Sequence, residues 1–241
     1  MTRPYRDFSD LVLNTEKGVD YDLTVVDRGG KVTVTAIHGG GIEPLTGELA
    51  TAIAEGEHNL YILRGLRPQG NETLRVPPSR YDEMRLRALF QRGQAALSLE
   101  GVGGEEEAVL LGGRNRRLRA ILQETLKEAG WETKSLSKVV APHDPALFFN
   151  RPAQGGVQLE LSHAVRTAMI DGPLSDFAWE EEGRRNERFQ DFVDAVRSAL
   201  ERYLLEMASD LDRTLKRFER ATDAFPPSMR DGDHEHEEED S

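Results

Sequence analysis

His38 and Glu43 stand on either side of three successive glycines, in the stretch VTVTAIHGGGIEPLTGELA at residues 32–50. Imidazole and carboxylate groups bind divalent metals and transfer protons in catalysis. The alternating residues before His38 predict a strand, and the residues after Glu43 predict a helix. Both side chains would therefore follow the carboxyl end of a strand, where α/β proteins form sites because loops carry polar groups while the sheet stays rigid.

Two further carboxylates belong to predicted strands. Glu100 directly follows the predicted strand 95–99, and Glu160 lies within the predicted strand 157–161. Taken singly, His38 is more often a structural histidine and Glu160 a residue on an exposed strand face. The sequence has no GxSxG, Walker A or HExxH motif, and no GxGxxG between a strand and a helix. Although the HGGG sequence is similar to the oxyanion loop of esterases, the absence of a nucleophile elbow gives that interpretation little support.

The elements that must position these residues alternate between strands and helices. The predicted strands are 23–26, 32–37, 59–64, 95–99, 108–111 and 157–161, and the predicted helices are 45–55, 81–92, 115–129 and a short one after 162. Residues 27–30 predict a hairpin or a tight turn between the first two strands. The alternation predicts an α/β fold with a mixed, mostly parallel sheet flanked by helices on both faces.

The carboxyl-terminal part has a different pattern. Apolar residues at steps of three and four predict one long amphipathic helix from about 186 to 222, which either packs on its own domain or forms a homodimer. Residues 231–240 contain seven acidic residues and no lysine or arginine, which predicts a disordered acidic tail. We expect three parts: an α/β metal-site domain at 1–183, a helical extension at 184–226 and the tail at 227–241.

Composition limits the classes of function. The 241 residues carry a net charge of −12, and removing the seven acidic residues of the tail still leaves −5. General binding to nucleic acid needs a basic face, so no nucleic-acid partner is expected. No apolar run is long enough to cross a membrane, no secretory signal is visible, and cysteine is absent. These features predict a cytoplasmic protein that does not associate with membranes.

Five motifs, taken together and in order, identify a family resemblance. They are AIHGGGIEPLTGELA at 36–50, LSLEGVGG at 97–104, LLGGRN at 110–115, FFNR at 148–151 and GGVQLELSHAVR at 155–166. This set resembles the poly-γ-glutamate hydrolase family of bacteriophages and bacteria. The resemblance implies a fold similar to zinc carboxypeptidases, one zinc ion, and hydrolysis of γ-glutamyl amide bonds in an acidic peptide polymer.

The resemblance also implies roles for particular residues. His38 and Glu43 match metal ligands of the family, and Glu160 matches its general base. The family's third ligand is a histidine in a strand-end motif, and this chain has Glu100 at that position. His163 or His143 would be an alternative third ligand, and His163 is the better candidate because it follows Glu160 closely.

A carboxylate at the third position changes the expected chemistry. One imidazole and two carboxylates bring the charge of a zinc site from +1 to 0, so a bound water would be less acidic, and Mn²⁺ or Mg²⁺ would compete better. The family role therefore leaves two alternatives: a metal-dependent hydrolase, or a catalytically impaired member that acts as an interaction or oligomerisation module. Substrate carboxylates would need cationic partners, for which the candidates are Arg64, Arg114, Arg151 and Arg166.

Overall fold

The computed structural model describes residues 5–136, 143–175 and 177–223. The chain divides into two compact units, Met1–Leu200 and Glu201–Ser241. The expected acidic tail, 227–241, lies outside the described residues, and the boundaries expected at 183 and 226 stay predictions. None of the helices in the described ranges is long and apolar enough to span a membrane.

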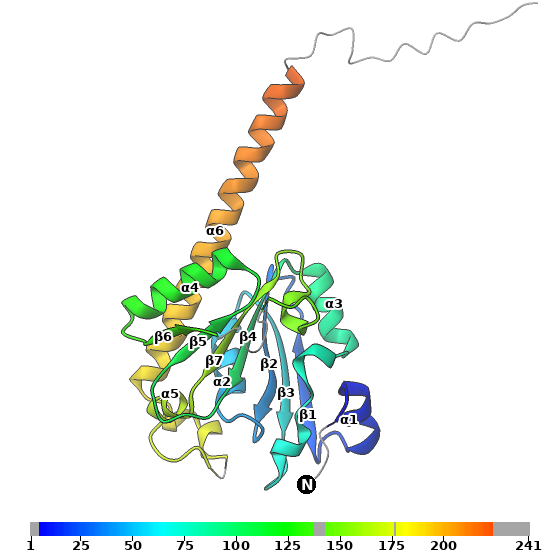
Figure 1. Ribbon diagram of the computed structural model, residues 1–241, viewed down its shortest axis with the longest axis vertical. Coiled ribbons are helices and arrows are strands. Elements are labelled where there is room, and N and C mark those ends of the chain that lie inside the picture. The colour runs from blue at the N-terminus through cyan, green and yellow to red at the C-terminus, as the bar shows by residue number, and fades with distance from the viewer. Residues whose placement is uncertain (1–4, 137–142, 176, 224–241) are drawn as a thin grey trace, which may run out of the picture. The chain divides into compact units, whose positions relative to one another are not determined.

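Within the described residues, seven strands and six α-helices form most of the secondary structure (Figure 1). The strands are β1 (Tyr21–Val26), β2 (Val32–Gly40), β3 (Asn59–Gly65), β4 (Ala95–Gly101), β5 (Val109–Gly112), β6 (Thr133–Ser135) and β7 (Gly156–Leu161). The helices are α1 (Phe8–Asn14), α2 (Thr46–Ala54), α3 (Met84–Arg92), α4 (Arg116–Glu128), α5 (His163–Ala168) and α6 (Glu187–Asp223).

The strands form one mixed sheet in the order β1-β3-β2-β4-β7-β5-β6. Its centre, β3-β2-β4-β7, is parallel, whereas β1 is antiparallel to β3 and β5 is antiparallel to β7. The prediction of an α/β fold with a mostly parallel mixed sheet is therefore confirmed. The parallel centre brings the carboxyl ends of β2, β4 and β7 to one edge of the sheet.

The predicted hairpin between the first two strands is wrong. β1 pairs with β3 instead, and β2 lies between β3 and β4. The connection that was expected to form a tight turn docks on the start of β3, where the side-chain oxygen of Asn59 accepts hydrogen bonds from the backbone N–H groups of Arg28 (2.9 Å) and Gly30 (3.1 Å). All of β2 is buried, as suits a central strand, whereas most of β1 is only partly buried, as suits an edge strand.

Helices cover both faces of the sheet. On one face, α1 and α3 contribute Phe8, Leu11, Leu86, Leu89 and Phe90 to a core that includes Tyr61 and Phe148. On the other face, α2 packs against β2 and β3, and Gly39 and Gly47 approach closely enough that a side chain on Gly39 would contact the α2 backbone. The sheet is thus held rigid from both sides, which fixes the positions of its strand ends.

The long carboxyl-terminal helix is confirmed as α6. Its first part, within the first compact unit, buries Phe189, Phe192, Val193, Val196 and Leu200. The Phe192 ring packs edge-on against Trp131, with 5.4 Å between ring centroids. Residues 187–200 therefore belong to the core of the α/β domain. Residues 201–223 continue the helix in the second unit, where Leu205, Leu211, Leu215 and Phe218 are exposed.

Candidate functional site

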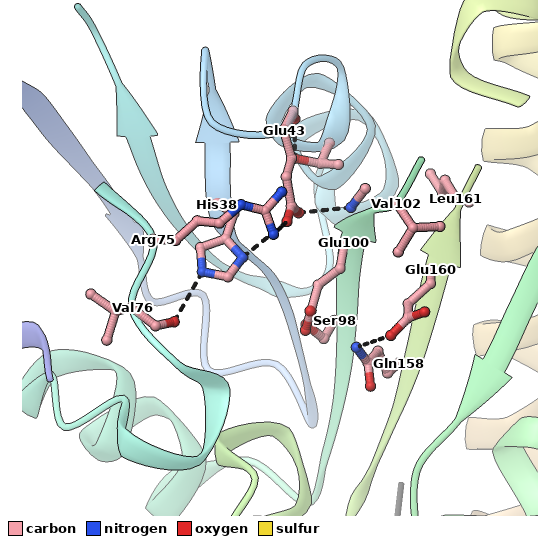
Figure 2. A network of polar contacts seen from close by, with 12 residues as sticks. His38, Glu43, Arg75, Val76, Ser98, Glu100, Val102, Gln158, Glu160 and Leu161 are labelled. Carbon is pink, nitrogen blue, oxygen red and sulfur yellow. Dashed lines mark hydrogen bonds and ion pairs between the residues drawn. The ribbon is translucent and has the colours of Figure 1, made fainter. Parts of the chain in front are cut away.

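His38 reaches the site from an irregular end of β2. The pairing of β2 with β3 is regular as far as Ala36 and shifts register before Gly39. Such a bulge bends the strand and re-aims a side chain. His38 Nδ1 lies 3.1 Å from Glu43 Oε1, and Nε2 lies 3.0 Å from the carbonyl oxygen of Val76 (Figure 2). Because both neighbours are acceptors, the doubly protonated ring satisfies both contacts.

The glycines after His38 allow the chain to turn in a crowded space. Gly40 has a φ of 61°, and a side-chain carbon there would lie 2.5 Å from the carbonyl oxygen of Gly65. A side-chain carbon on Gly41 would lie 2.3 Å from the amide nitrogen of Asn71. Only glycine fits these positions without displacing the neighbouring strand and loop. The tight turn places Glu43 back beside His38.

Glu43 is the centre of the polar network. Its side chain is 2% exposed, and Oε1 contacts both His38 Nδ1 and Arg75 Nη1, the latter at 2.8 Å. The backbone N–H of Gly101 donates to Oε2 at 2.7 Å. Burial alone raises the pKa of Glu43, but His38, Arg75 and the Gly101 N–H together lower it below its usual range. Glu43 is therefore ionised, and it ties the glycine turn to the end of β4.

The ion pair with Glu43 also raises the pKa of His38. Burial in the core lowers the pKa of the ring, but the Coulombic attraction and hydrogen bond of Glu43 outweigh this effect. Glu100 adds a smaller contribution in the same direction, and Arg75 opposes it. His38 and Glu43 thus form a buried ion pair at the carboxyl edge of the sheet.

Glu100 and Glu160 lie side by side on β4 and β7, where they are register partners. Partners in a parallel pair point to the same face of the sheet. Ser98 Oγ donates to Glu100 at 3.3 Å, and Gln158 Nε2 donates to Glu160 at 3.0 Å. Figure 2 shows both carboxylates beside the His38–Glu43 pair. The structure thus brings together the four residues for which the sequence predicted metal binding or catalysis.

The two carboxylates hold protons more tightly than ordinary glutamates. Burial and the nearby charge of Glu43 raise the pKa of Glu100 to about 7, with Glu160 contributing and His38 opposing. Burial, with a smaller effect of Glu43, also raises the pKa of Glu160. A carboxylate with a raised pKa is suited to accept and return a proton near neutral pH.

Arg166 has a structural role at this site. It is buried and donates hydrogen bonds to three backbone carbonyls: those of Pro44 (3.1 Å), Leu161 (3.3 Å) and Val102 (3.0 Å). These carbonyls belong to the chain after Glu43, the end of β7 and the chain after β4. Arg166 therefore fixes the segments that carry the three carboxylates, and these contacts use three of its five N–H donors.

Arg114 and Arg151 are not brought to the site. Arg114 Nη2 lies 3.3 Å from the carbonyl oxygen of Ala153, and Arg151 Nη1 donates to that of Tyr81 at 2.6 Å. The reason is the direction of β5: because it runs antiparallel to β7, the residues after its carboxyl end lie near the amino end of β7. Sequence reasoning proposed Arg114 and Arg151 for carboxylate recognition because they stand in the family's motifs, which do not show at which end of β7 these residues lie.

The remaining candidates differ in position. Arg64, at the end of β3, pairs with Glu180 at 3.8 Å and lies beside Gly40 of the glycine turn. His163 is exposed at the start of α5, with Nε2 3.4 Å from Thr167 Oγ1. His143 Nδ1 lies 2.8 Å from the carbonyl oxygen of Gly113. Arg64 thus borders the site, and neither histidine is drawn into the carboxylate cluster.

Sequence reasoning missed Arg75. This residue follows the short 3-10 helix Asn71–Leu74 and belongs to no strand or motif that would have marked it. Its ion pair with Glu43 spans a long stretch of sequence, and a positive residue in a loop is ordinarily a surface group. The neighbouring Val76 carbonyl, which contacts His38, was missed for the same reason.

The donor types at this site suit a divalent cation, but the side chains are not arranged around one. One imidazole and three carboxylates from Glu43, Glu100 and Glu160 offer nitrogen and oxygen donors of the kinds that Zn²⁺, Mn²⁺ and Mg²⁺ accept. Burial, together with the charge of Glu43, raises the pKa of Glu100, and a nearby cation would favour its ionised form. Even so, within the described ranges no three His, Asp or Glu side chains are gathered closely enough to hold a metal. The negative charge of Glu43 is instead balanced by the positive charges of Arg75 and His38.

The mixed sheet carries a histidine and carboxylates at the carboxyl edge of its parallel centre (Figure 2), which defines an α/β protein with a candidate active site at that edge. A family model described as poly-gamma-glutamate hydrolase matches residues 5–195, and the chain belongs to this family. A solved bacteriophage poly-gamma-glutamate hydrolase superposes with a TM-score of 0.78 at 28% identity, covering 83% of this chain and 97% of that one. The family that the motifs predicted is therefore confirmed.

Bacterial relatives support the same assignment. The UPF0714 protein YndL of Bacillus subtilis (strain 168) is 30% identical over 197 residues, which cover 80% of this chain and 75% of YndL. The solved zinc-free form of YndL superposes with a TM-score of 0.71 at 28% identity, covering 82% of this chain and 96% of that one. The UPF0714 protein YmaC of the same organism is 29% identical, covering 82% of this chain and 84% of YmaC.

Proposed function

We propose that the protein hydrolyses γ-glutamyl amide bonds in poly-γ-glutamate or a related acidic peptide polymer, with the help of one divalent metal ion. His38, Glu43 and Glu100 would hold the ion, which is zinc or, given the carboxylate-rich donor set, manganese or magnesium. The observation that carries the proposal is the pairing of Glu100 with Glu160 beside the His38–Glu43 pair, in a chain of this hydrolase family.

Glu160 is the proposed general base. When bound, the metal would polarise the amide carbonyl and lower the pKa of the attacking water. Glu160 accepts a proton from that water as its oxygen bonds to the carbonyl carbon, and returns the proton to the leaving nitrogen as the C–N bond breaks. One carboxylate and one amine are released. Gln158 orients the Glu160 carboxylate through its hydrogen bond.

The chain as a whole has a net charge of −12 and would repel a polyanionic substrate. Positively charged side chains close to the site are therefore needed to bind it. Arg64 has 34% of its side chain exposed and Arg75 has 46% exposed, so both can reach a ligand. Both lie close to the glycine turn. We propose that these two arginines bind substrate carboxylates, and that Arg166 supports the site from behind.

The test uses the untagged full-length chain carrying His234→Ala and His236→Ala, so that the tail histidines bind no metal. The chain is treated with a chelator and supplied separately with Zn²⁺, Mn²⁺ or Mg²⁺. We expect poly-γ-glutamate to be shortened only when a metal is present, with release of new amino groups, and poly-α-glutamate to be left intact. Absence of cleavage with every metal would contradict the proposal and favour the catalytically impaired alternative.

A further inference from the structure

Arg75 stands where a metal ion would have to approach Glu43. Its Nη1 lies 2.8 Å from Glu43 Oε1, the same oxygen that faces His38 Nδ1 at 3.1 Å. The other oxygen, Oε2, accepts the Gly101 N–H at 2.7 Å. In Figure 2 the guanidinium and the imidazole reach the same carboxylate from neighbouring directions. The oxygen that could join His38 in binding a metal is thus already paired with a cation.

A divalent ion and this guanidinium exclude each other. A metal bound to Glu43 Oε1 would lie about 2.0–2.2 Å from it. Two cations this close together on one carboxylate oxygen would repel each other. Either the guanidinium contacts Glu43 or the ion does.

The position of Arg75 also allows its side chain to move away from Glu43. Glu43, its partner, is buried, but Arg75 itself has 46% of its side chain exposed and lies in a loop. Arg166 differs, since it is buried and held by three carbonyls. Movement of Arg75 toward solvent breaks its ion pair with Glu43 and leaves the core packing intact.

We propose that Arg75 is a built-in cation that takes the place of the metal on Glu43, is displaced when the metal binds, and then becomes available to a substrate carboxylate. The last step rests on the proposed function, whereas the competition with metal does not. The consequence is that this chain binds metal more weakly than its donor set alone would allow.

Calorimetric titration of Zn²⁺ into the full-length chain tests the competition without any measurement of activity. The tail histidines are again replaced, and the titration compares the parent with Arg75→Gln, Arg75→Lys and Arg92→Gln. Arg92 pairs with Asp27 and is far from Glu43 in the sequence, so its replacement removes the same charge without touching the site. Urea unfolding of each variant establishes that it is folded.

We expect Arg75→Gln to bind Zn²⁺ about tenfold more tightly than the parent, which corresponds to the loss of one ion pair as competitor. Arg75→Lys and Arg92→Gln should bind within about twofold of the parent. Unchanged or weaker binding by Arg75→Gln, or no zinc binding by any variant, would overturn the competition. If the zinc affinities are as expected but the zinc-loaded parent does not cleave poly-γ-glutamate, the competition stands and the proposed function is contradicted.

A second inference concerns the helix of the second unit, described through Asp223. Leu204, Ala208, Leu211, Leu215 and Phe218 follow each other at alternating steps of four and three residues, which is the spacing of a coiled-coil seam. Leu211 is 59% exposed and Leu215 is 54% exposed. An apolar seam at this spacing fits a partner helix of the same pattern.

Charge indicates which partner and which direction. Residues 201–212 contain four acidic residues and one basic residue, whereas residues 213–223 contain four basic and two acidic residues. An antiparallel copy of the same helix would set each acidic half opposite a basic half. We infer that this segment forms an antiparallel homodimer with a second copy of the chain.

Light scattering after gel filtration tests the dimer on the full-length chain. We expect the parent to have the mass of a dimer, Leu211→Glu that of a monomer, and Ser209→Glu, away from the seam, that of a dimer. A monomeric parent, or a dimeric Leu211→Glu variant, would overturn the inference. The chain lacks cysteine, so a spin label on Arg220→Cys reports direction: labels roughly 25 Å apart support the antiparallel dimer, and adjacent labels contradict it.

Discussion

The Glu160→Gln variant is expected to hydrolyse γ-glutamyl amide bonds about a thousandfold more slowly than the parent, at saturating metal and substrate. Glutamine keeps the shape of glutamate and can still contact Gln158, but it cannot accept a proton from water. A positioned general base contributes about 10²–10⁴ in rate. The loss should therefore fall on kcat, with KM nearly unchanged. Release of amino groups from poly-γ-glutamate measures both constants.

Glu105→Gln provides the matched control. Glu105 is an exposed carboxylate in the loop after β4, and the same chemical change there should leave kcat within about twofold of the parent. If Glu160→Gln keeps more than about a tenth of the parental kcat, Glu160 is not the base.

The position of Glu160, the proposed base, was predictable in part because the strand ends of a parallel sheet meet at one edge. Glu100 and Glu160 each followed or ended an apolar run, and His38 ended another, which placed all three at the ends of predicted strands. The family motifs added roles to these residues. Local patterns thus predicted the α/β layers, and the family motifs selected the four central residues.

The errors arose where strand direction or long-range pairing decides the outcome. A tight-turn composition at 27–30 predicted a hairpin, but the side chain of Asn59 holds that segment against β3. Because β5 is antiparallel to β7, Arg114 lies near the amino end of β7, away from the carboxyl edge. Neither effect leaves a periodic signal, because each depends on contacts between segments far apart in the sequence.

Arg75 illustrates the same limit within the site. The sequence showed a carboxylate at the third ligand position, Glu100, and so predicted an altered metal preference. It could not show that a loop arginine supplies a positive charge to Glu43 at 2.8 Å. Glu43 also raises the pKa of His38, which favours the positively charged ring. Arg75 and His38 therefore balance part of the negative charge of the carboxylates. Glu100 is the carboxylate that remains poorly compensated.

The Glu100→Gln variant is therefore expected to gain stability relative to the parent as pH rises. Burial and Glu43 raise the pKa of Glu100 in the folded protein to about 7, from a usual value of 4.5. The folded state thus binds this proton more tightly than the unfolded chain does. Below pH 4.5 Glu100 is protonated in both states and costs nothing. Between pH 4.5 and 7 the unfolded chain ionises first, so the parent loses stability, and above pH 7 the loss is complete.

The expected size is about 3 kcal/mol in free energy of unfolding, gained by Glu100→Gln over the parent between pH 4.5 and pH 8. Urea unfolding with a chelator present, at pH 4.5 and at pH 8, measures how much the stability difference between variant and parent changes with pH, and Glu105→Gln serves again as the exposed control. Glu43 has the opposite sign, since its lowered pKa makes its contribution disappear as pH falls.

The same measurement with metal in place of chelator connects this stability to the proposed site. A cation held by Glu100 would favour its ionised form and so bring its folded pKa back toward the usual value. The gain of Glu100→Gln over the parent at pH 8 should then shrink, or reverse as the parent binds the ion and the variant binds it less well. A gain that is identical with and without Zn²⁺, Mn²⁺ and Mg²⁺ would remove Glu100 from the set of ligands.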